Sequence, residues 1–497
     1  MPKPDHPAPS PRNVHFFDEM FAGKGHIRDH YQSYANWLHA HSSEDMKARR
    51  EEAIELFHRI GITFSVYGDG TLSERTIPFD TVPRIIPAAD WKHLERGLEQ
   101  RAKALNAFLD DAYHNRSLVS AGLMSHEDID RHPCYQSMMR QVDLPNNVHA
   151  HICGIDIVRN SDGTFYVLED NLRTPSGVSY MLENRRMMMR LFPELFIQQH
   201  IAPIHQYPDY LYETLCEASP NSGGSPTIAV LTPGRFNSAY FEHAYLAQNM
   251  GVELVEASDL VVREHKVFMK TTSGLERIDV IYRRIDDEFL DPAVFRSDSV
   301  LGVAGLMDAY RRGHVSIVNA VGNGIADDKS MYPLIPALIR FYLAEEPILA
   351  NVPTYRCQNQ EDLAYTLEHL EELVVKEAQG SGGYGMLVGP HASPEEVNQF
   401  RKRILAQPSA YIAQPTLALS TCPTYSGDLL SPRHIDLRPF VLMGKTIRIV
   451  PGGLTRVALK EGSLVVNSSQ GGGTKDTWIA ESDFTTYDPD FDKGAVC

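Results

Sequence analysis

One stretch of the sequence combines a strand lysine with a glycine-rich loop. Residues 374–385 read VVKEAQGSGGYG, with Lys376 in the apolar first part and four glycines behind it. Glycine lets backbone N–H groups turn toward an anion, and the lysine adds a compact positive charge. The lysine precedes the glycines, so the spacing is not that of a Walker loop. The order favours a loop that folds over phosphates as a flap, and a flexible hairpin with a surface lysine is the simpler alternative.

A second stretch predicts a hairpin that gathers oxygen-bearing side chains. Residues 152–169 read as two strands around an Asn-Ser-Asp-Gly turn. Glu169 and Asn171 are two apart and therefore share a face of the second strand. A four-residue loop places Asp156 opposite Val167, with Glu169 on the diagonal. Three such side chains suit a hard cation and predict a Mg²⁺ site, with a solvated hairpin face as the alternative.

Arginines near strand ends could complete such a site. Arg173 follows the acidic hairpin, and Arg438 and Arg456 bracket a later predicted hairpin. Each alone is an ordinary surface charge. Beside a glycine flap and a carboxylate hairpin, arginines become plausible clamps for phosphate or carboxylate.

The elements around these residues predict an α/β protein. Strands and helices alternate after the serine- and glycine-rich linker at residues 221–226, as in a Rossmann-like layer with a parallel sheet. No GxGxxG motif follows its first strand, so we predict no dinucleotide site. We expect a helix that Asp90 caps, a helix opened by Asp328 and Lys329, and a helix over residues 394–406.

The predicted organisation has six parts. They are a disordered leader (1–13), an N-terminal mainly helical region (14–150), a metal-binding hairpin segment (151–205), a Rossmann-like domain (226–330), a segment with the lysine strand and the glycine-rich loop (331–480) and a tail (481–497).

The amino-acid composition limits the kinds of binding partner that we expect. The 497 residues carry a net charge of −17, which argues against nucleic acid or an anionic membrane as the main ligand. Six scattered cysteines without a CxxC pair suggest reduced thiols of a cytoplasmic protein rather than a disulfide framework. No apolar run is long enough to span a membrane.

The order of these motifs resembles the circularly permuted ATP-grasp family of type 2, which is distantly similar to glutathionylspermidine synthetase. The segments SERTIPFDTVPRIIP, LEDNLRTPSGVSYMLENR and VVKEAQGSGGYG carry the resemblance. The Asp … Glu-x-Asn strand pair, expected after the flap in an unpermuted ATP-grasp chain, here lies before it. The resemblance implies a circularly permuted ATP-grasp fold with a Rossmann-like pre-ATP-grasp domain and an N-terminal helical region. It further implies that residues 331–480 form nucleotide-binding subdomains.

The resemblance also implies roles for individual residues. The expected phosphate-binding lysines are Lys329 and Lys376, and Gln414 is expected beside the adenine and ribose. The flap over the triphosphate would be Gly380, Ser381, Gly382, Gly383 and Gly385. Asp156, Glu169 and Asn171 would hold Mg²⁺, and Arg438, Arg456 and Arg173 would stabilise the transferring phosphoryl group or a substrate carboxylate.

The implied activity is that of an ATP-dependent carboxylate–amine ligase that works through an acyl phosphate. Its partners would be ATP, Mg²⁺, a small-molecule or peptide carboxylate and an amine acceptor. A kinase needs the same nucleotide site and stays open as an alternative, as does a non-catalytic nucleotide-binding scaffold. The sequence does not identify the two substrates or the oligomeric state.

Overall fold

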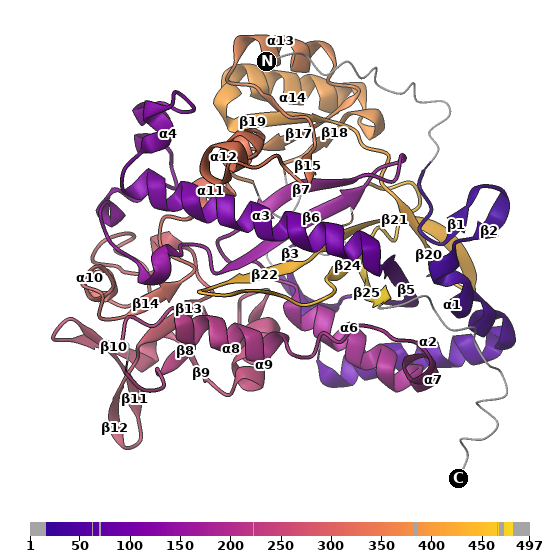
Figure 1. The fold of residues 1–497 in the computed structure, drawn as a ribbon, viewed down its shortest axis with the longest axis horizontal. Helices are drawn as coiled ribbons and strands as arrows, with labels where there is room; N and C mark the ends of the chain where they lie inside the picture. Colours follow the sequence, from indigo (N-terminus) through magenta and orange to yellow (C-terminus); the bar gives the residue numbers. More distant parts are fainter. Residues whose placement is uncertain are drawn as a thin grey trace.

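The computed structural model describes residues 16–61, 63–68, 71–221, 223–380, 385–464, 466 and 472–480. The predicted leader (1–13) and tail (481–497) lie outside them. A ten-stranded central sheet, a four-stranded parallel sheet and a four-stranded antiparallel sheet form the main layers, with helices packed around them (Figure 1). This mixed architecture confirms the predicted α/β fold class.

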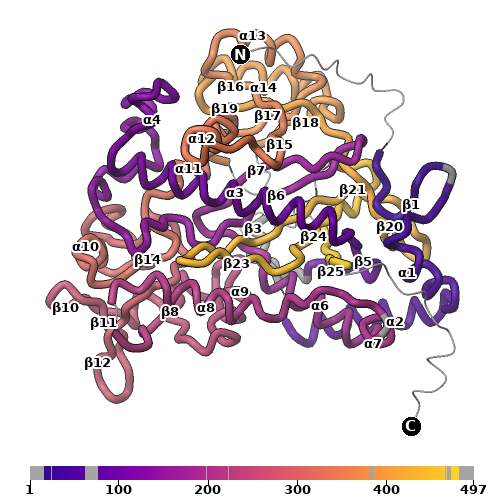
Figure 2. The backbone as a smooth tube through the Cα atoms, in the orientation of Figure 1, coloured from indigo at the N-terminus to yellow at the C-terminus, as the bar shows by residue number. Residues whose placement is uncertain are grey.

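The central sheet joins segments from both ends of the chain. Its main path runs β15-β7-β6-β21-β24-β25-β5, with β20, β22 and β23 attached at β21 and β6. The strands are β5 (Phe79–Pro87), β6 (Ile152–Arg159), β7 (Phe165–Asn171), β15 (Ala350–Asn351), β20 (Thr421–Ser426), β21 (Leu429–Arg438), β22 (Phe440–Met443), β23 (Ile447–Ile449), β24 (Leu454–Val457) and β25 (Gly473–Ala480). β5 runs parallel to β25, so the region predicted as mainly helical also supplies a strand of this sheet (Figure 2).

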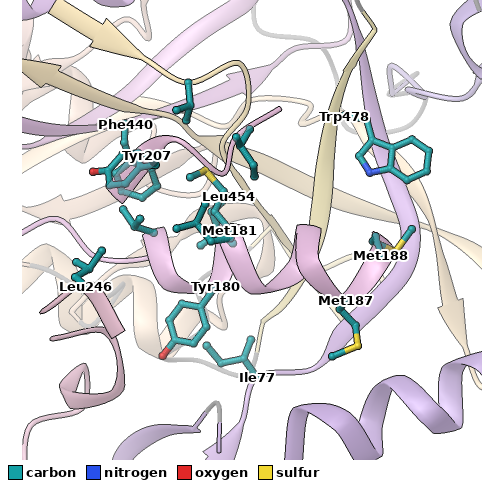
Figure 3. Close-up of a cluster of buried hydrophobic side chains, with 14 of the residues drawn as sticks. Ile77, Tyr180, Met181, Met187, Met188, Tyr207, Leu246, Phe440, Leu454 and Trp478 are labelled. Carbon is teal, nitrogen blue, oxygen red and sulfur yellow. The ribbon is translucent and has the colours of Figure 1, made fainter. Parts of the chain in front are cut away.

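Two helices cover opposite faces of the central sheet. α3 (Ala88–Tyr113) packs on one face and α6 (Val178–Leu191) on the other. Successive residues of β25 alternate accordingly: Trp478 belongs to the apolar cluster under α6, and Ile479 to the cluster under α3. Figure 3 shows Met181 and Met188 of α6 in the cluster that contains Trp478. Truncating this fully buried tryptophan to alanine should cost about 3–5 kcal/mol.

The predicted cap of α3 is wrong. The helix begins at Ala88 after Pro87, whose extended backbone ends β5, and no side chain caps it. Asp90 lies inside the first turn, and its carboxylate accepts a hydrogen bond from Arg159 at 3.0 Å. An acidic residue there still interacts favourably with the helix dipole.

The second layer is the predicted Rossmann-like one. β8 (Ile228–Leu231), β9 (Glu253–Val255), β13 (Val280–Arg283) and β14 (Ser316–Val318) are all parallel, in the order β14-β13-β8-β9. α9 (Tyr240–Met250) and α10 (Leu306–Arg311) belong to the connections. The chain reverses direction across the sheet between β8 and β13, which makes this the topological switch point of a doubly wound layer. A separate antiparallel ribbon follows β9: β10 (Leu260–Arg263), β11 (Lys266–Thr271) and β12 (Gly274–Arg277).

The third layer carries the lysine strand. Its antiparallel order is β16 (Tyr355–Arg356), β19 (Tyr411–Pro415), β17 (Leu373–Glu377) and β18 (Leu387–Val388). α13 (Gln360–Glu368) and α14 (Pro394–Ala406) accompany this sheet at the top of Figure 1. α14 has the predicted bounds, and a capping box of Ser393 and Glu396 begins it.

The remaining elements are short or peripheral. The helices are α1 (Asp29–Ala40), α2 (Ser43–Ile60), α4 (Ser117–Ser120), α5 (His126–Asp130), α7 (Pro193–Gln198), α8 (Tyr207–Glu217), α11 (Gly324–Asp327) and α12 (Ile335–Leu343), and the strands are β1 (Phe21–Ala22), β2 (His26–Ile27), β3 (Thr63–Gly68) and β4 (Thr71–Thr76). Across the described ranges, no helix is both long enough and apolar enough to cross a membrane. The five described cysteines are free thiols.

Candidate functional site

A cleft opens between the antiparallel lysine sheet and the central sheet. Its empty space is about 990 Å³, counting the part open to solvent, which is ample for a small-molecule ligand. Its charged lining consists of Asp156, Glu169, Lys329, Lys376, Glu377, Asp436 and Arg456. Its apolar lining includes Val352, Val374, Met386, Val388, Leu417, Leu419, Leu464 and Val466. A ligand that carries both an apolar or aromatic group and a strongly charged group finds partners for each in this lining.

Lys376 projects from β17 into the cleft and is held by the neighbouring strand. Its Nζ donates to Gln414 Oε1 at 2.9 Å, and Gln414 Nε2 donates to Thr354 Oγ1 at 3.0 Å. Gln414 is only 2% exposed, so its amide is committed to these two partners. Desolvation in the cleft lowers the pKa of Lys376 to about 8, although Glu169 opposes the shift.

Lys329 reaches the same cleft from the other side. Its Nζ donates to Gly380 O at 2.6 Å and lies 3.5 Å from Glu169 Oε2. The prediction that Lys329 opens a helix is wrong: α11 ends at Asp327, and α12 begins only at Ile335. The extended backbone of Asp328 ends the first helix and leaves Lys329 in the connection, where its ammonium links the flap to the hairpin.

The structure describes the two ends of the flap, Gly380 and Gly385. Gly380 accepts the Lys329 hydrogen bond, and Gly385 has φ +69°, a conformation that favours glycine. A Cβ at Gly385 would also approach the Glu377 carboxylate to 2.9 Å. The three other predicted flap residues, Ser381, Gly382 and Gly383, lie outside the described residues.

The acidic hairpin forms as predicted, but its register differs. Asp156 pairs directly with Glu169, and Ile157 pairs with Val167, because the pairing shifts between Asp156 and Ile157. One extra residue on β7 produces this bulge, which a two-residue periodicity cannot reveal. The bulge brings the two carboxylate-bearing residues directly opposite each other.

Two arginines enclose Asp156. Arg438 donates from Nε and Nη2 to its two carboxylate oxygens at 2.5 and 2.7 Å, and Arg456 Nη2 donates at 2.6 Å. Arg456 also forms a bidentate pair with Asp436. Burial alone would raise the pKa of Asp156, but the two guanidiniums hold it well below its usual range. Burial keeps the pKa of Asp436 above its usual value despite Arg456.

The oxygen donors partly fit a divalent cation. Glu169 is partly exposed in the cleft, with Arg438 at 3.9 Å, and Asn171 has a buried amide nitrogen without a partner. Both oxygens of Asp156 are engaged by arginine, so its role as a metal ligand stays a prediction. Within the described part of the chain, no three His, Cys, Asp or Glu side chains form a ready metal cluster. A cation here would rely first on Glu169 and Asn171, whose carboxylate and amide oxygens suit Mg²⁺.

Arg173 is paired with Asp327 rather than facing the cleft. Its Nε and backbone N–H both donate to Asp327 Oδ2, at 2.9 and 3.1 Å, and it does not line the cleft. Its two terminal nitrogens make no hydrogen bond to the residues that the structure describes. Asp327 raises the pKa of Arg173 despite the opposing effect of burial, so the side chain remains cationic.

Two carboxylates of the cleft, Asp436 and Glu377, were not predicted from the sequence. Asp436 is completely buried beside Asp156, and Glu377 packs against both described ends of the flap. The Asp-x-Arg pattern that contains Arg438 was the available signal for Asp436. The apolar side chains of the cleft could not be predicted as ligand contacts, because valines and leucines in strands usually belong to the hydrophobic core.

A lysine-bearing antiparallel sheet facing an acidic hairpin across a cleft is the arrangement of an ATP-grasp protein. Residues 83–458 match the family described as circularly permuted ATP-grasp type 2, and the chain belongs to this family. The chain is also similar, with 10% identity and a TM-score of 0.54, to an apo glutathione synthetase-like effector from Globodera pallida. That similarity covers 88% of this chain and 98% of the effector, and it supports the fold alone.

Sequence relatives extend over most of the chain. An uncharacterized protein of Synechocystis sp. is 51% identical over 94% of this chain and 97% of its own length. An uncharacterized protein of Mycobacterium tuberculosis is 47% identical over 93% of this chain and 84% of its own length. A Frankia casuarinae protein named putative glutamate–cysteine ligase is 42% identical over 93% of this chain, but this covers only 53% of that protein.

Proposed function

We propose that this protein is an ATP-dependent carboxylate–amine ligase that forms an amide or peptide bond. The observation that carries the proposal is the convergence of Lys376, Lys329 and Glu169 on one cleft from three separate segments. Family membership and the Frankia relative named as a ligase support the reaction class. Because that relative is about twice as long, its named substrates are not transferred to this chain.

ATP would lie in the cleft with its base against apolar side chains of the lining. Lys329 and Lys376 would hold the phosphates, and the flap of residues 380–385 would cover them. Gln414 would act mainly through Lys376, since both ends of its amide are already bonded. Arg438 and Arg456 would face the charge that develops on the transferring phosphoryl group.

Mg²⁺ would be held by Glu169 and Asn171, with Asp156 as the third predicted ligand. When bound, the ion would neutralise phosphate charge and orient the triphosphate. Asp156 also anchors two arginines, so it would bind the ion only after releasing one of them.

The proposed reaction has two steps. A carboxylate oxygen attacks the γ-phosphorus, the bond to the β-phosphate oxygen breaks, and ADP departs. The product of this step is an acyl phosphate. An amine then attacks the acyl carbon, phosphate leaves, and the nitrogen loses a proton to give the amide. The intermediate hydrolyses readily, so a closing flap that excludes water would favour the ligase reaction.

Hydroxylamine trapping tests this proposal. The purified protein is incubated with MgATP, hydroxylamine and pools of amino acids and peptides, and ADP, phosphate and hydroxamate are measured. A ligase releases ADP and phosphate and forms hydroxamate with the right acid, and an amide when an amine replaces hydroxylamine. A stable phosphorylated product without free phosphate indicates the kinase, and nucleotide binding without turnover under any acid indicates the scaffold.

A further inference from the structure

A buried ion pair connects the Rossmann-like layer to the segment that follows the acidic hairpin. Arg284 follows β13, Glu242 lies in α9, and Arg284 Nη2 is 3.1 Å from Glu242 Oε1 with both side chains 1% exposed. Arg284 stands at the carboxyl end of β13, beside the switch point with β8. Ligands of doubly wound folds usually bind there. Here the protein's own side chains occupy this position.

The pair holds the turn that follows the acidic hairpin. Arg284 Nη1 donates to Pro175 O at 2.9 Å, and Nη2 donates to Ser176 Oγ at 2.6 Å. Glu242 Oε2 accepts from the backbone N–H groups of Gly177 and Ser179, at 2.8 and 3.1 Å. The turn thus accepts hydrogen bonds from Arg284, and Gly177 and Ser179, at the start of α6, donate hydrogen bonds to Glu242.

The turn also holds Arg438, the arginine that pairs with Asp156 of the cleft. Arg438 Nη1 donates to Ser176 O at 3.2 Å, while its other nitrogens bind Asp156. Gly177 has φ +122°, and a Cβ there would approach Leu454 to 2.8 Å. Glycine alone adopts this backbone conformation easily, and the close packing against Leu454 leaves no room for a larger residue at this position.

We propose that Glu242 and Arg284 are positioning residues for the cleft: they fix the turn of residues 175–177 and, through Ser176 O, the guanidinium of Arg438. The Rossmann-like layer then supports the phosphoryl-transfer site rather than binding a nucleotide at its own switch point. This inference rests on the proposed function, because Arg438 is taken to act on the transferring phosphoryl group.

Conservative variants test the role with little change in side-chain volume. Glu242→Gln keeps the shape of the side chain but leaves the buried Arg284 without its carboxylate partner. Arg284→Lys keeps the charge but loses the two-pronged contact with the turn. We expect kcat to fall about 10- to 100-fold, because a misplaced donor loses transition-state stabilisation, while the KM for ATP changes less than about threefold.

A buried ion pair between α6 and β25 provides the matched control. Arg185 of α6 binds Asp476 of β25 at 2.8 Å, with side chains 6% and 1% exposed. The other hydrogen bonds of Arg185 go to Ala202 O and Thr477 O, not to the turn. Asp476→Asn should lower Tm to a similar extent as Glu242→Gln but leave kcat within about twofold, because distant sites act independently. Equal losses of kcat in the two variants would mean that Glu242→Gln acts only by destabilising the fold. That result would overturn the proposal.

A double-mutant cycle with Arg438→Lys locates the effect. If Glu242 acts through Arg438, adding Glu242→Gln to Arg438→Lys should lower kcat by less than about twofold further. If the double variant instead loses kcat by the product of the two single losses, Glu242 acts by another route and the inference is wrong.

Hydrogen exchange separates this inference from the proposed function. A wild-type protein without ATP turnover refutes the ligase proposal but still allows the positioning contact to be measured. The amides of residues 176–179 should exchange faster in Glu242→Gln than in the wild type, with no such change in Asp476→Asn. Unchanged exchange in Glu242→Gln overturns the positioning role whatever the activity.

Discussion

Lys329 Nζ lies 3.5 Å from Glu169 Oε2, although the Rossmann-like layer separates the two residues in the chain. Glu169 belongs to a strand of the central sheet, and Lys329 to the connection that leads toward the lysine sheet. Their contact joins the proposed metal and phosphate positions. The permuted motif order is compatible with one cleft, because the fold brings these distant segments together.

Replacing Glu169 should separate activity from folding. Glu169→Gln removes one carboxylate charge from a partly exposed cleft residue with little change in shape. We expect Mg²⁺-dependent ATP turnover to fall by about 100-fold or more, since a carboxylate ligand is lost. Tm should change little, as measured by thermal melting. Glu371→Gln, an exposed change in the lysine-sheet layer, is the control and should keep full activity; turnover retained in Glu169→Gln would show that the metal site lies elsewhere.

The lowered pKa of Lys376 predicts weaker nucleotide binding at alkaline pH. A pKa of about 8 means that the ammonium loses its proton just above neutrality. The Kd for an unhydrolysed ATP analogue should therefore rise with pH above about 8, by up to about tenfold per unit, in calorimetric titrations. Lys376→Arg retains its charge in this range and should lose the pH dependence. An identical slope in that variant would assign the titration to another group.

The same group makes stability pH-dependent with a defined sign. The folded pKa of Lys376 lies below its unfolded value, which is about 10.4. Between these values the unfolded chain binds more protons than the folded one, so the free energy of unfolding contributed by Lys376 rises with pH. Urea titrations of the wild type and Lys376→Met between pH 8 and 10 should differ in slope in this direction. The difference should vanish below pH 7, where both states keep the proton.

Gln414 should act through Lys376. Its Oε1 accepts the Lys376 hydrogen bond at 2.9 Å, so Gln414→Glu places a negative charge beside the ammonium. The pKa of Lys376 should rise, and the alkaline loss of analogue binding should move to higher pH. Gln414→Leu should weaken binding by removing the partner, and it should add little in a Lys376→Ala background. Fully additive effects would instead favour direct contact of Gln414 with the nucleotide.

The sequence predicted the elements that carry periodic patterns and short motifs. The hairpin, the parallel layer and α14 follow from alternation, strand–helix rhythm and a Ser-Pro-Glu-Glu start. Asp156 and Glu169 were predicted to share a face, and they do. Their direct pairing was not predictable, because one extra residue in β7 shifts the register without disturbing the alternation on either side.

The features of the site that could not be predicted depend on partners far away in the chain. Both oxygens of Asp156 bind arginines that lie about 280 and 300 residues later, a relation that no local pattern encodes. Arg284 and Glu242 look like ordinary charges of a strand end and a helix, and only the fold brings them to the turn at residues 175–177. The position of Lys329 was misjudged for a similar reason: its neighbours suggest a helix start, but its ammonium binds Gly380 of a distant loop.

Arg173 should affect the acid substrate more than ATP. Its terminal nitrogens are unbonded within the described structure, while Asp327 holds its Nε, so a cationic fork is presented next to the predicted metal strand. A substrate carboxylate bound there gains a charge-assisted contact worth about 1.5–3 kcal/mol. Arg173→Ala should therefore raise the KM for the acid about 10- to 100-fold and the KM for ATP less than about threefold.

The control for Arg173 is its own partner. Arg173→Ala leaves the Asp327 carboxylate, whose pKa burial already raises, without its guanidinium. Asp327→Asn removes the same ion pair but keeps the arginine fork, so it should lower Tm yet change the KM for the acid less than about threefold. Steady-state kinetics with the acid identified by hydroxamate formation measures both variants. If Asp327→Asn raises the KM as much as Arg173→Ala, the ion pair supports α11 and the substrate carboxylate binds elsewhere.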